Sequence, residues 1–251
     1  VIRFNAQAMT DLFPGAGPVK TEIVGRITDE KERQAKRIQT DMNWQASEKI
    51  TGYRSETDMM LFNLPLAGTT FRKLYFDPLR KFPAAEYVLP EHVVMPYTAA
   101  GLDSTPRFAV ILPKTKNWIE AKQAQGFYRA DVEVGEGVVV STPIKEAKDK
   151  IEGKQNSNTY KDALHRLYES HIDWFFAEDP LVTDNQPHPY IITVDSVSHK
   201  VLSIRRNWRE GDPAMERQVS LVQHKYMPGF GPYGIGLINI LGGLTESATS
   251  I

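Results

Sequence analysis

The spacing of apolar residues changes near Thr69, and this change constrains the fold more than any other feature of the sequence. Before Thr69, apolar residues recur at helical spacing. After it, short runs rich in branched and aromatic residues alternate with prolines, which is typical of strands joined by turns. A last helical pattern closes the chain. Helices are expected over about residues 4–13, 29–46, 54–66 and 235–251. We therefore predict an α+β fold with an antiparallel sheet region and a terminal helix.

The β-like runs are short and numerous, as expected for antiparallel strands. They cover residues 18–27, 71–76, 85–89, 93–97, 107–112, 128–134, 164–176, 190–194, 200–206 and 220–226. Residues 196–199 favour a hairpin turn between two of them. Among these runs we expect a short helix over 116–125 and a polar helix up to about Ile151. A mobile stretch is expected to follow at 153–159.

Composition excludes several classes of function. The formal net charge is −1, whereas a protein that grips nucleic acid over its whole surface usually carries a basic excess. The absence of cysteine excludes disulfides, thiolate catalysis and cysteine metal sites. No run of about 18 apolar residues exists, so we expect no membrane-spanning helix. Since the chain begins at Val1 and stops within a helical pattern, we expect it to be an excerpt of a longer protein.

The sharpest local motif is G-x-G-x-x-G over residues 229–234. It follows an expected strand and opens an expected helix, as a dinucleotide-binding turn requires. Against that reading, Pro232 removes a backbone N–H that a phosphate would need, and no acid lies about 20 residues on. The motif therefore favours a glycine-rich connection between a strand and a helix. The alternative, a nucleotide-binding enzyme domain that uses the Gly229–Gly236 loop, stays open.

The remaining residues carry no recognisable catalytic pattern. There is no G-x-S-x-G elbow, and the six histidines lack metal-ligand spacing. We therefore assign no catalytic residue, metal or cofactor, and predict that the chain is not an enzyme. Basic side chains gather at Arg205, Arg206 and Arg209 around Trp208, which is a pattern for phosphate contact and base stacking. The competing interpretation is local pairing with acids such as Glu210 and Asp212.

Several segments, taken in chain order, carry a resemblance to a known family. They are Gly17–Gly25, Met42–Gln45, Tyr53–Glu56, Leu64–Gly68, Lys148–Gly153, Pro189–Asp195, Lys200–Trp208, Pro228–Leu237 and Gly242–Leu244. In this ordered set, which spans nearly the whole chain, the sequence resembles the portal (head–tail connector) proteins of podovirus-type and related tailed bacteriophages. No single segment is a strict signature, and the order of the set is what carries the resemblance.

The resemblance implies a structural role. Portal proteins form a dodecameric ring at one vertex of the capsid, and viral DNA is packaged and ejected through the channel of that ring. The implied partners are the major capsid protein, the terminase, tail adaptor proteins and double-stranded DNA in transit, with no membrane. The implied location is the virion, after assembly in the host cytoplasm. The family has no catalytic residues, so none is carried over. A different virion protein, such as an adaptor, is a milder alternative.

Applied to this chain, the resemblance divides it into two parts. Residues 1–234 correspond to a mixed helical and antiparallel-sheet wing, and residues 235–251 to the truncated start of a long stem helix. A helix that passes from wing to stem needs backbone freedom before it. We therefore interpret Gly229, Gly231, Gly234 and Gly236 as the hinge to the stem. At helical spacing beyond them, we predict that Ile235, Ile238, Leu241 and Leu244 pack against a neighbouring subunit or a second stem helix.

Overall fold

The computed structural model describes residues 1–50, 52–77, 81–137, 143–151, 153, 163–182, 184, 186–229 and 231–249. The chain forms two compact units, each with its own sheet. Unit 1 comprises Val1–Glu91, Tyr97–Ser104 and Val219–Ile251. Unit 2 comprises His92–Pro96 and Thr105–Gln218.

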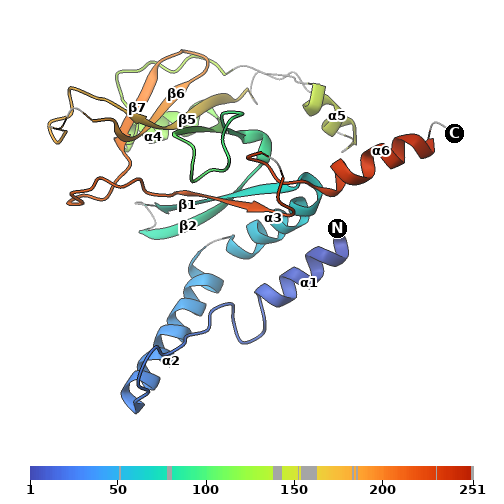
Figure 1. Cartoon of the computed structure of the whole chain (residues 1–251). Coiled ribbons are helices and arrows are strands. Elements are labelled where there is room, and N and C mark those ends of the chain that lie inside the picture. Colours follow the sequence, from blue (N-terminus) through green and yellow to red (C-terminus); the bar gives the residue numbers. More distant parts are fainter. Residues whose placement is uncertain are drawn as a thin grey trace. The chain divides into compact units, whose positions relative to one another are not determined.

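Unit 1 contains four of the α-helices in Figure 1. They are α1 (Ile2–Leu12), α2 (Asp29–Trp44), α3 (Tyr53–Ala67) and α6 (Leu237–Thr249). The side chain of Thr28 caps α2 by accepting a hydrogen bond from the backbone N–H of Lys31. A π-helical turn, η1 (Gln45–Lys49), continues α2. Gly68, with φ of 77°, ends α3 in the left-handed conformation that glycine adopts without strain.

The sheet of unit 1 has the order β2–β1–β8, from Phe82–Val88, Thr69–Asp77 and Leu221–Lys225. Both pairings are antiparallel, so the late strand β8 joins a hairpin formed early in the chain. Helix α3 packs against β1 and β2 (Figure 1) and buries Met60, Leu61 and Leu64. The apolar residues of the third expected helix therefore form part of the core of this unit.

Unit 2 is built on a five-stranded antiparallel sheet with the order β3–β4–β5–β6–β7. The strands are Val93–Val94, Arg107–Lys114, His165–Trp174, His188–Asp195 and Val201–Arg206. Helices α4 (Lys116–Ala124) and α5 (Pro143–Ile151) lie between β4 and β5 in the chain, and a short 3₁₀ turn, η2 (Pro90–His92), precedes β3. Ile119 of α4 is fully buried in a core cluster with Leu167 of β5 and Leu202 of β7.

The α+β class is confirmed by the helices and antiparallel sheets of the two units. The prediction of strands over residues 18–27 and 128–134 is wrong, since both segments are irregular. The backbone of Val19 forms its hydrogen bonds with the side chain of Asn43 and not with a neighbouring strand. The Val19 N–H donates to Asn43 Oδ1 at 2.8 Å, and Asn43 Nδ2 donates to the Val19 carbonyl at 3.0 Å. Residues 128–134 alternate because Tyr128, Val132 and Val134 enter the core, and not because they join a ladder.

The terminal helix begins two residues later than expected, at Leu237, and is described as far as Thr249. A long stem helix is not shown. The expected division between wing and stem at 234/235 lies inside unit 1 and stays a prediction. The stretch expected to be mobile at 153–159 lies, apart from Gly153, outside the described residues. Among the helices that are described, none combines the length and the apolarity needed to cross a membrane.

Candidate functional site: glycine segment and terminal helix

The glycine segment, residues 227–236, packs backbone to backbone against the end of α3. Ile235 N–H donates to the carbonyl of Met227 at 2.9 Å and forms an isolated antiparallel bridge. A Cβ added at Gly234 would lie 2.4 Å from the carbonyl oxygen of Gly68, and one at Gly236 would lie 2.2 Å from that of Leu66. Only glycine permits this approach, so these two positions are fixed by packing.

The last three backbone amides of the glycine segment, those of residues 234–236, are occupied. Gly234 N–H donates to Thr69 Oγ1 at 2.6 Å, and Gly236 N–H donates to Asn239 Oδ1 at 3.1 Å. With the Ile235 amide in the bridge and no N–H at Pro232, three consecutive donors are used and a fourth does not exist. A phosphate cradle needs such donors free and pointing at the ligand. The geometry therefore disfavours the dinucleotide-binding alternative.

The four glycines that we expected to form a hinge differ in their surroundings. A Cβ at Gly229 would lie 2.3 Å from the carbonyl oxygen of Tyr233, whereas one at Gly231 would meet no atom within 4 Å. None of Gly229, Gly231, Gly234 and Gly236 has a left-handed φ. At Gly229, Gly234 and Gly236, the missing side chain allows another backbone segment to come close, and no unusual dihedral angle is involved. The hinge stays a prediction.

Helix α6 exposes most of the apolar residues that we expected to pack against a neighbour. Ile238 is 62% exposed, Leu241 49% and Leu244 67%, and Ile240 beside them is also exposed. Ile235 differs, because it lies in the bridge before the helix and is half-buried. No charged residue occurs from Leu237 to Thr245. A helix with this surface buries apolar area only when something else covers it.

The glycines inside α6 approach no other segment of the described chain closely. A Cβ added at Gly242 or Gly243 would meet nothing within 4 Å. Glycine in a helix interior is less favourable than alanine by about 1 kcal/mol. Two adjacent glycines on an exposed helix therefore reduce its stability without relieving any contact in the described part of unit 1. Small residues of this kind allow another backbone to approach closely.

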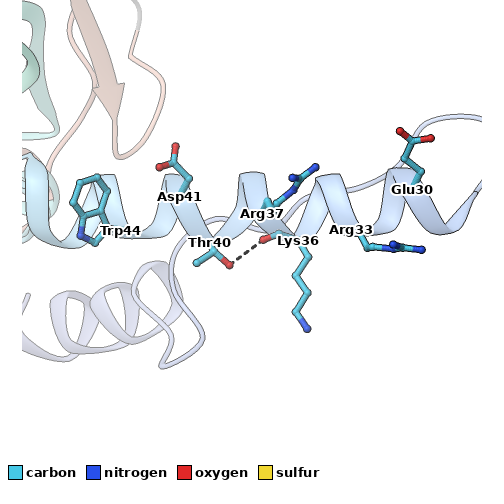
Figure 2. A pocket seen from close by; sticks show the side chains of 7 residues that line it. All are labelled: Glu30, Arg33, Lys36, Arg37, Thr40, Asp41 and Trp44. Carbon is cyan, nitrogen blue, oxygen red and sulfur yellow. Dashed lines mark hydrogen bonds between the residues drawn. The ribbon is translucent and has the colours of Figure 1, made fainter.

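A second exposed surface, which the sequence did not single out, runs along α2. An open hollow is lined by residues of this helix alone, whose side chains are drawn in Figure 2, and α2 has no buried residue. Three cations, Arg33, Lys36 and Arg37, form no ion pair among the described residues. Trp44 ends the row, with the ammonium of Lys49 4.8 Å from its ring centroid. The hollow is open to solvent and encloses no volume that would hold a small molecule.

The basic cluster of unit 2 is paired internally. Arg206 donates two hydrogen bonds to the carboxylate of Asp179, at 2.7 and 2.6 Å, and Tyr190 donates a third at 2.9 Å. Arg205 lies 3.5 Å from Glu169 and 4.5 Å above the ring of Phe127. The described hydrogen bonds and ion pairs of Arg205 and Arg206 therefore go to Glu169 and Asp179, and not to Glu210 and Asp212, the acids that we expected. The hydrogen bond with Asp179, and to a smaller extent the charge of Glu210, raise the pKa of the Arg206 guanidinium. Asp212 instead accepts backbone N–H groups of its own turn.

This pairing limits what the cluster can do. The guanidinium of Arg206 holds the pKa of Asp179 far below its usual range, while burial and the same carboxylate raise the pKa of Tyr190 to about 12. Trp208 is buried against Tyr190, with ring centroids 5.3 Å apart, so it is not placed to stack on a base. Arg209 alone of the three arginines is exposed and unpaired among the described residues. Contact of the cluster with DNA stays a prediction.

Two histidines of the expected strand 164–176 are buried. His165 lies 3.0 Å from Asp195, and His171 lies 3.2 Å from Glu169. The alternation His165, Leu167, Glu169, His171 on β5 is the signal that places these side chains on one face of the sheet. In the described part of the chain, no group of three potential metal ligands occurs. Each histidine and carboxylate thus forms a structural pair inside unit 2.

Comparison with protein-family models and with curated proteins found no match for this chain. Its function is therefore inferred from its residues and geometry. The fold and the exposed α6 define a class: an α+β protein whose terminal helix has an apolar surface that the described residues do not cover. That class includes subunits that pack against copies of themselves.

Proposed function

We propose that this chain is a structural subunit of a self-assembled ring, and specifically a portal protein of a tailed bacteriophage. The ring forms the channel for DNA packaging and ejection at one capsid vertex. It docks the terminase and later the tail adaptor proteins, and it contacts the major capsid protein. The chain acts by packing and not by catalysis, and it uses no cofactor. The assignment as a portal protein is supported by the resemblance of its segments, taken in chain order, to that family.

The observation that carries the proposal is the exposed apolar surface of α6. Ile238, Leu241 and Leu244 recur at helical spacing and lie open. Covering such side chains stabilises a complex by about 1.5–3 kcal/mol for each that is fully buried. Gly242 and Gly243 leave room for a second backbone beside them. A ring built by heterologous contacts covers this surface on every subunit, since each copy presents it to the next.

The mass of the protein in solution tests this proposal. Native mass spectrometry of the full-length protein should find a closed assembly at about twelve times the mass of its own subunit. End-on electron microscopy of the same sample should show an annulus. The double variant Ile238→Lys, Leu244→Lys should shift the protein to monomers, because two buried charges in the contact are costly.

A matched control separates a specific contact from general solubility. Val24 is also in unit 1 and is 92% exposed, so Val24→Lys should leave the mass unchanged. A full-length wild-type protein that stays monomeric at every concentration contradicts the proposal. An assembly whose mass the α6 double variant does not alter contradicts the assignment of α6 to the contact.

A further inference from the structure

Arg72 on β1 is a buried cation that forms no ion pair within 4 Å among the described residues. The carboxylate of Glu56 on α3 instead accepts the backbone N–H of Tyr87, the strand partner of Arg72, at 2.8 Å. Only 8% of Arg72 is exposed. Arginine is almost never buried this deeply without an ionic partner, because an unpaired charge loses hydration. Its contacts are the hydroxyl of Thr57, to which Nη2 donates, and the ring of Tyr53, whose centroid lies 5.0 Å from the guanidinium carbon. Neither group is negatively charged.

The strand register places further polar groups beside Arg72. Arg72 is paired with Tyr87 of β2 and Val222 of β8, and Thr70 is paired with His224. Directly paired residues project to the same face of a sheet, as do residues two apart in one strand. Thr70, Arg72, Tyr87 and His224 therefore share one face.

Several hydrogen-bond donors on this face have no acceptor among the described residues. Arg72 Nε, Thr70 Oγ1 and Tyr87 Oη are enclosed and unpartnered. Arg72 Nη1 forms no hydrogen bond either, but it is not among the enclosed atoms, so it is the nitrogen through which solvent reaches the guanidinium. Buried donors are nearly always paired. An acceptor with several oxygens would satisfy the guanidinium and these hydroxyls together.

We propose that the Arg72 cluster, defined as Arg72, Thr70 and Tyr87, binds one oxyanion. Its ligand is a negatively charged group that offers at least two acceptor oxygens to a guanidinium, as a phosphate or a carboxylate does. The oxyanion comes either from solution, as inorganic phosphate, or from an acidic side chain of a second copy of the chain. The proposal does not depend on the portal function.

His224 reports occupancy in the unmodified protein. Burial, and then the charge of Arg72, lower the pKa of the His224 imidazole. A bound oxyanion offsets the charge of Arg72, so inorganic phosphate should raise that pKa. Histidine-resolved NMR titration with and without phosphate, at constant ionic strength, measures the change. A pKa of His224 that phosphate leaves unchanged counts against the free-anion source.

Thermal unfolding gives an independent measurement. Phosphate at ten times its dissociation constant should raise the midpoint of unit 1 by roughly 3–5 °C relative to chloride. Phosphate also stabilises folded proteins generally, so the variant Arg72→Met defines that background. The control Arg209→Met removes an exposed arginine and should keep the full increase.

Sedimentation distinguishes the second source. If a second copy supplies the carboxylate, the wild type self-associates, phosphate competes with that association, and Arg72→Met weakens it at least tenfold. The proposal is overturned when phosphate changes neither the pKa of His224 nor the self-association of the wild type. Both readouts use the wild type, so they decide the question even where Arg72→Met fails to fold.

Discussion

At the scale of single residues, one half-buried histidine makes the stability of unit 1 depend on pH. Burial, and then Arg72, keep the pKa of His224 below the 6.5 of the unfolded chain. The unfolded state therefore binds more protons as pH falls through that range. The contribution of neutral His224 is complete above pH 6.5 and is lost as pH falls below it.

This dependence can be isolated by substitution. His224→Gln should flatten the loss of stability below pH 6.5, because glutamine does not titrate. Urea unfolding at several pH values measures the difference between variant and wild type. His199→Asn is a matched control, since His199 is exposed and asparagine tolerates its positive φ of 55°. An acid dependence of His224→Gln equal to that of the wild type would contradict the assignment.

A second residue-scale prediction concerns Asp179, which links the segment before β6 to β7. Its carboxylate accepts from Arg206 and Tyr190 and is almost fully buried. Asp179→Asn should destabilise unit 2 by about 2–3 kcal/mol, because the charge-assisted hydrogen bonds are lost. The depressed pKa of Asp179 means that its contribution is present above pH 3.8 and is lost as pH falls below that value. Asp131→Asn, at the exposed pair with Arg129, should change stability little.

At the scale of elements, the glycine segment should be intolerant of substitution at one end. Gly236→Ala places a methyl group 2.2 Å from the carbonyl oxygen of Leu66, where only backbone can yield. We expect a loss of about 2–4 kcal/mol in the free energy of unfolding of unit 1, from overpacking and displacement of α6. Gly231→Ala, with open space around it, is the control and should change stability by less than about 1 kcal/mol. Equal effects of the two substitutions would show that the segment is not packed as described.

An element was predictable from the sequence where the residues with the pattern of a helix or strand also form the hydrogen bonds of that element. β5 was expected over 164–176 and is formed by His165–Trp174, because its alternation matches a ladder with β4 and β6. The run 18–27 alternates similarly, but Asn43 supplies the hydrogen bonds that a strand would have supplied, and no local pattern encodes that contact.

The candidate site was predictable to a similar extent. Helical spacing identified Ile238, Leu241 and Leu244, and these lie exposed on α6. The glycine motif was found, but its close approach to Leu66 and Gly68 depends on a contact between segments far apart in the chain. The partners of Arg205 and Arg206 were missed for the same reason. Glu169 and Asp179 are remote in sequence and are brought near by the sheet.

At the scale of the whole molecule, the two units differ in how their charged and apolar groups are satisfied. In unit 2, several arginines are paired internally, as in Arg206 with Asp179 and Arg217 with Asp173. In unit 1, the cations of α2 and of Arg72 form no ion pair among the described residues, and α6 exposes apolar side chains. Contacts with partners are therefore expected mainly in unit 1.

The glycine pair of α6 allows folding and assembly to be separated. Gly242→Ala with Gly243→Ala should increase the helicity of α6, since alanine is favoured by about 1 kcal/mol at each position and its Cβ meets no atom of another described segment within 4 Å. The same methyl groups should obstruct a helix of the neighbouring subunit. We therefore expect circular dichroism to show more helix while native mass spectrometry shows less assembled ring. Ser247→Ala on the same helix, which adds no bulk, should leave the assembly intact. A double alanine variant that assembles as well as the wild type would mean that no neighbouring backbone approaches α6 at these glycines.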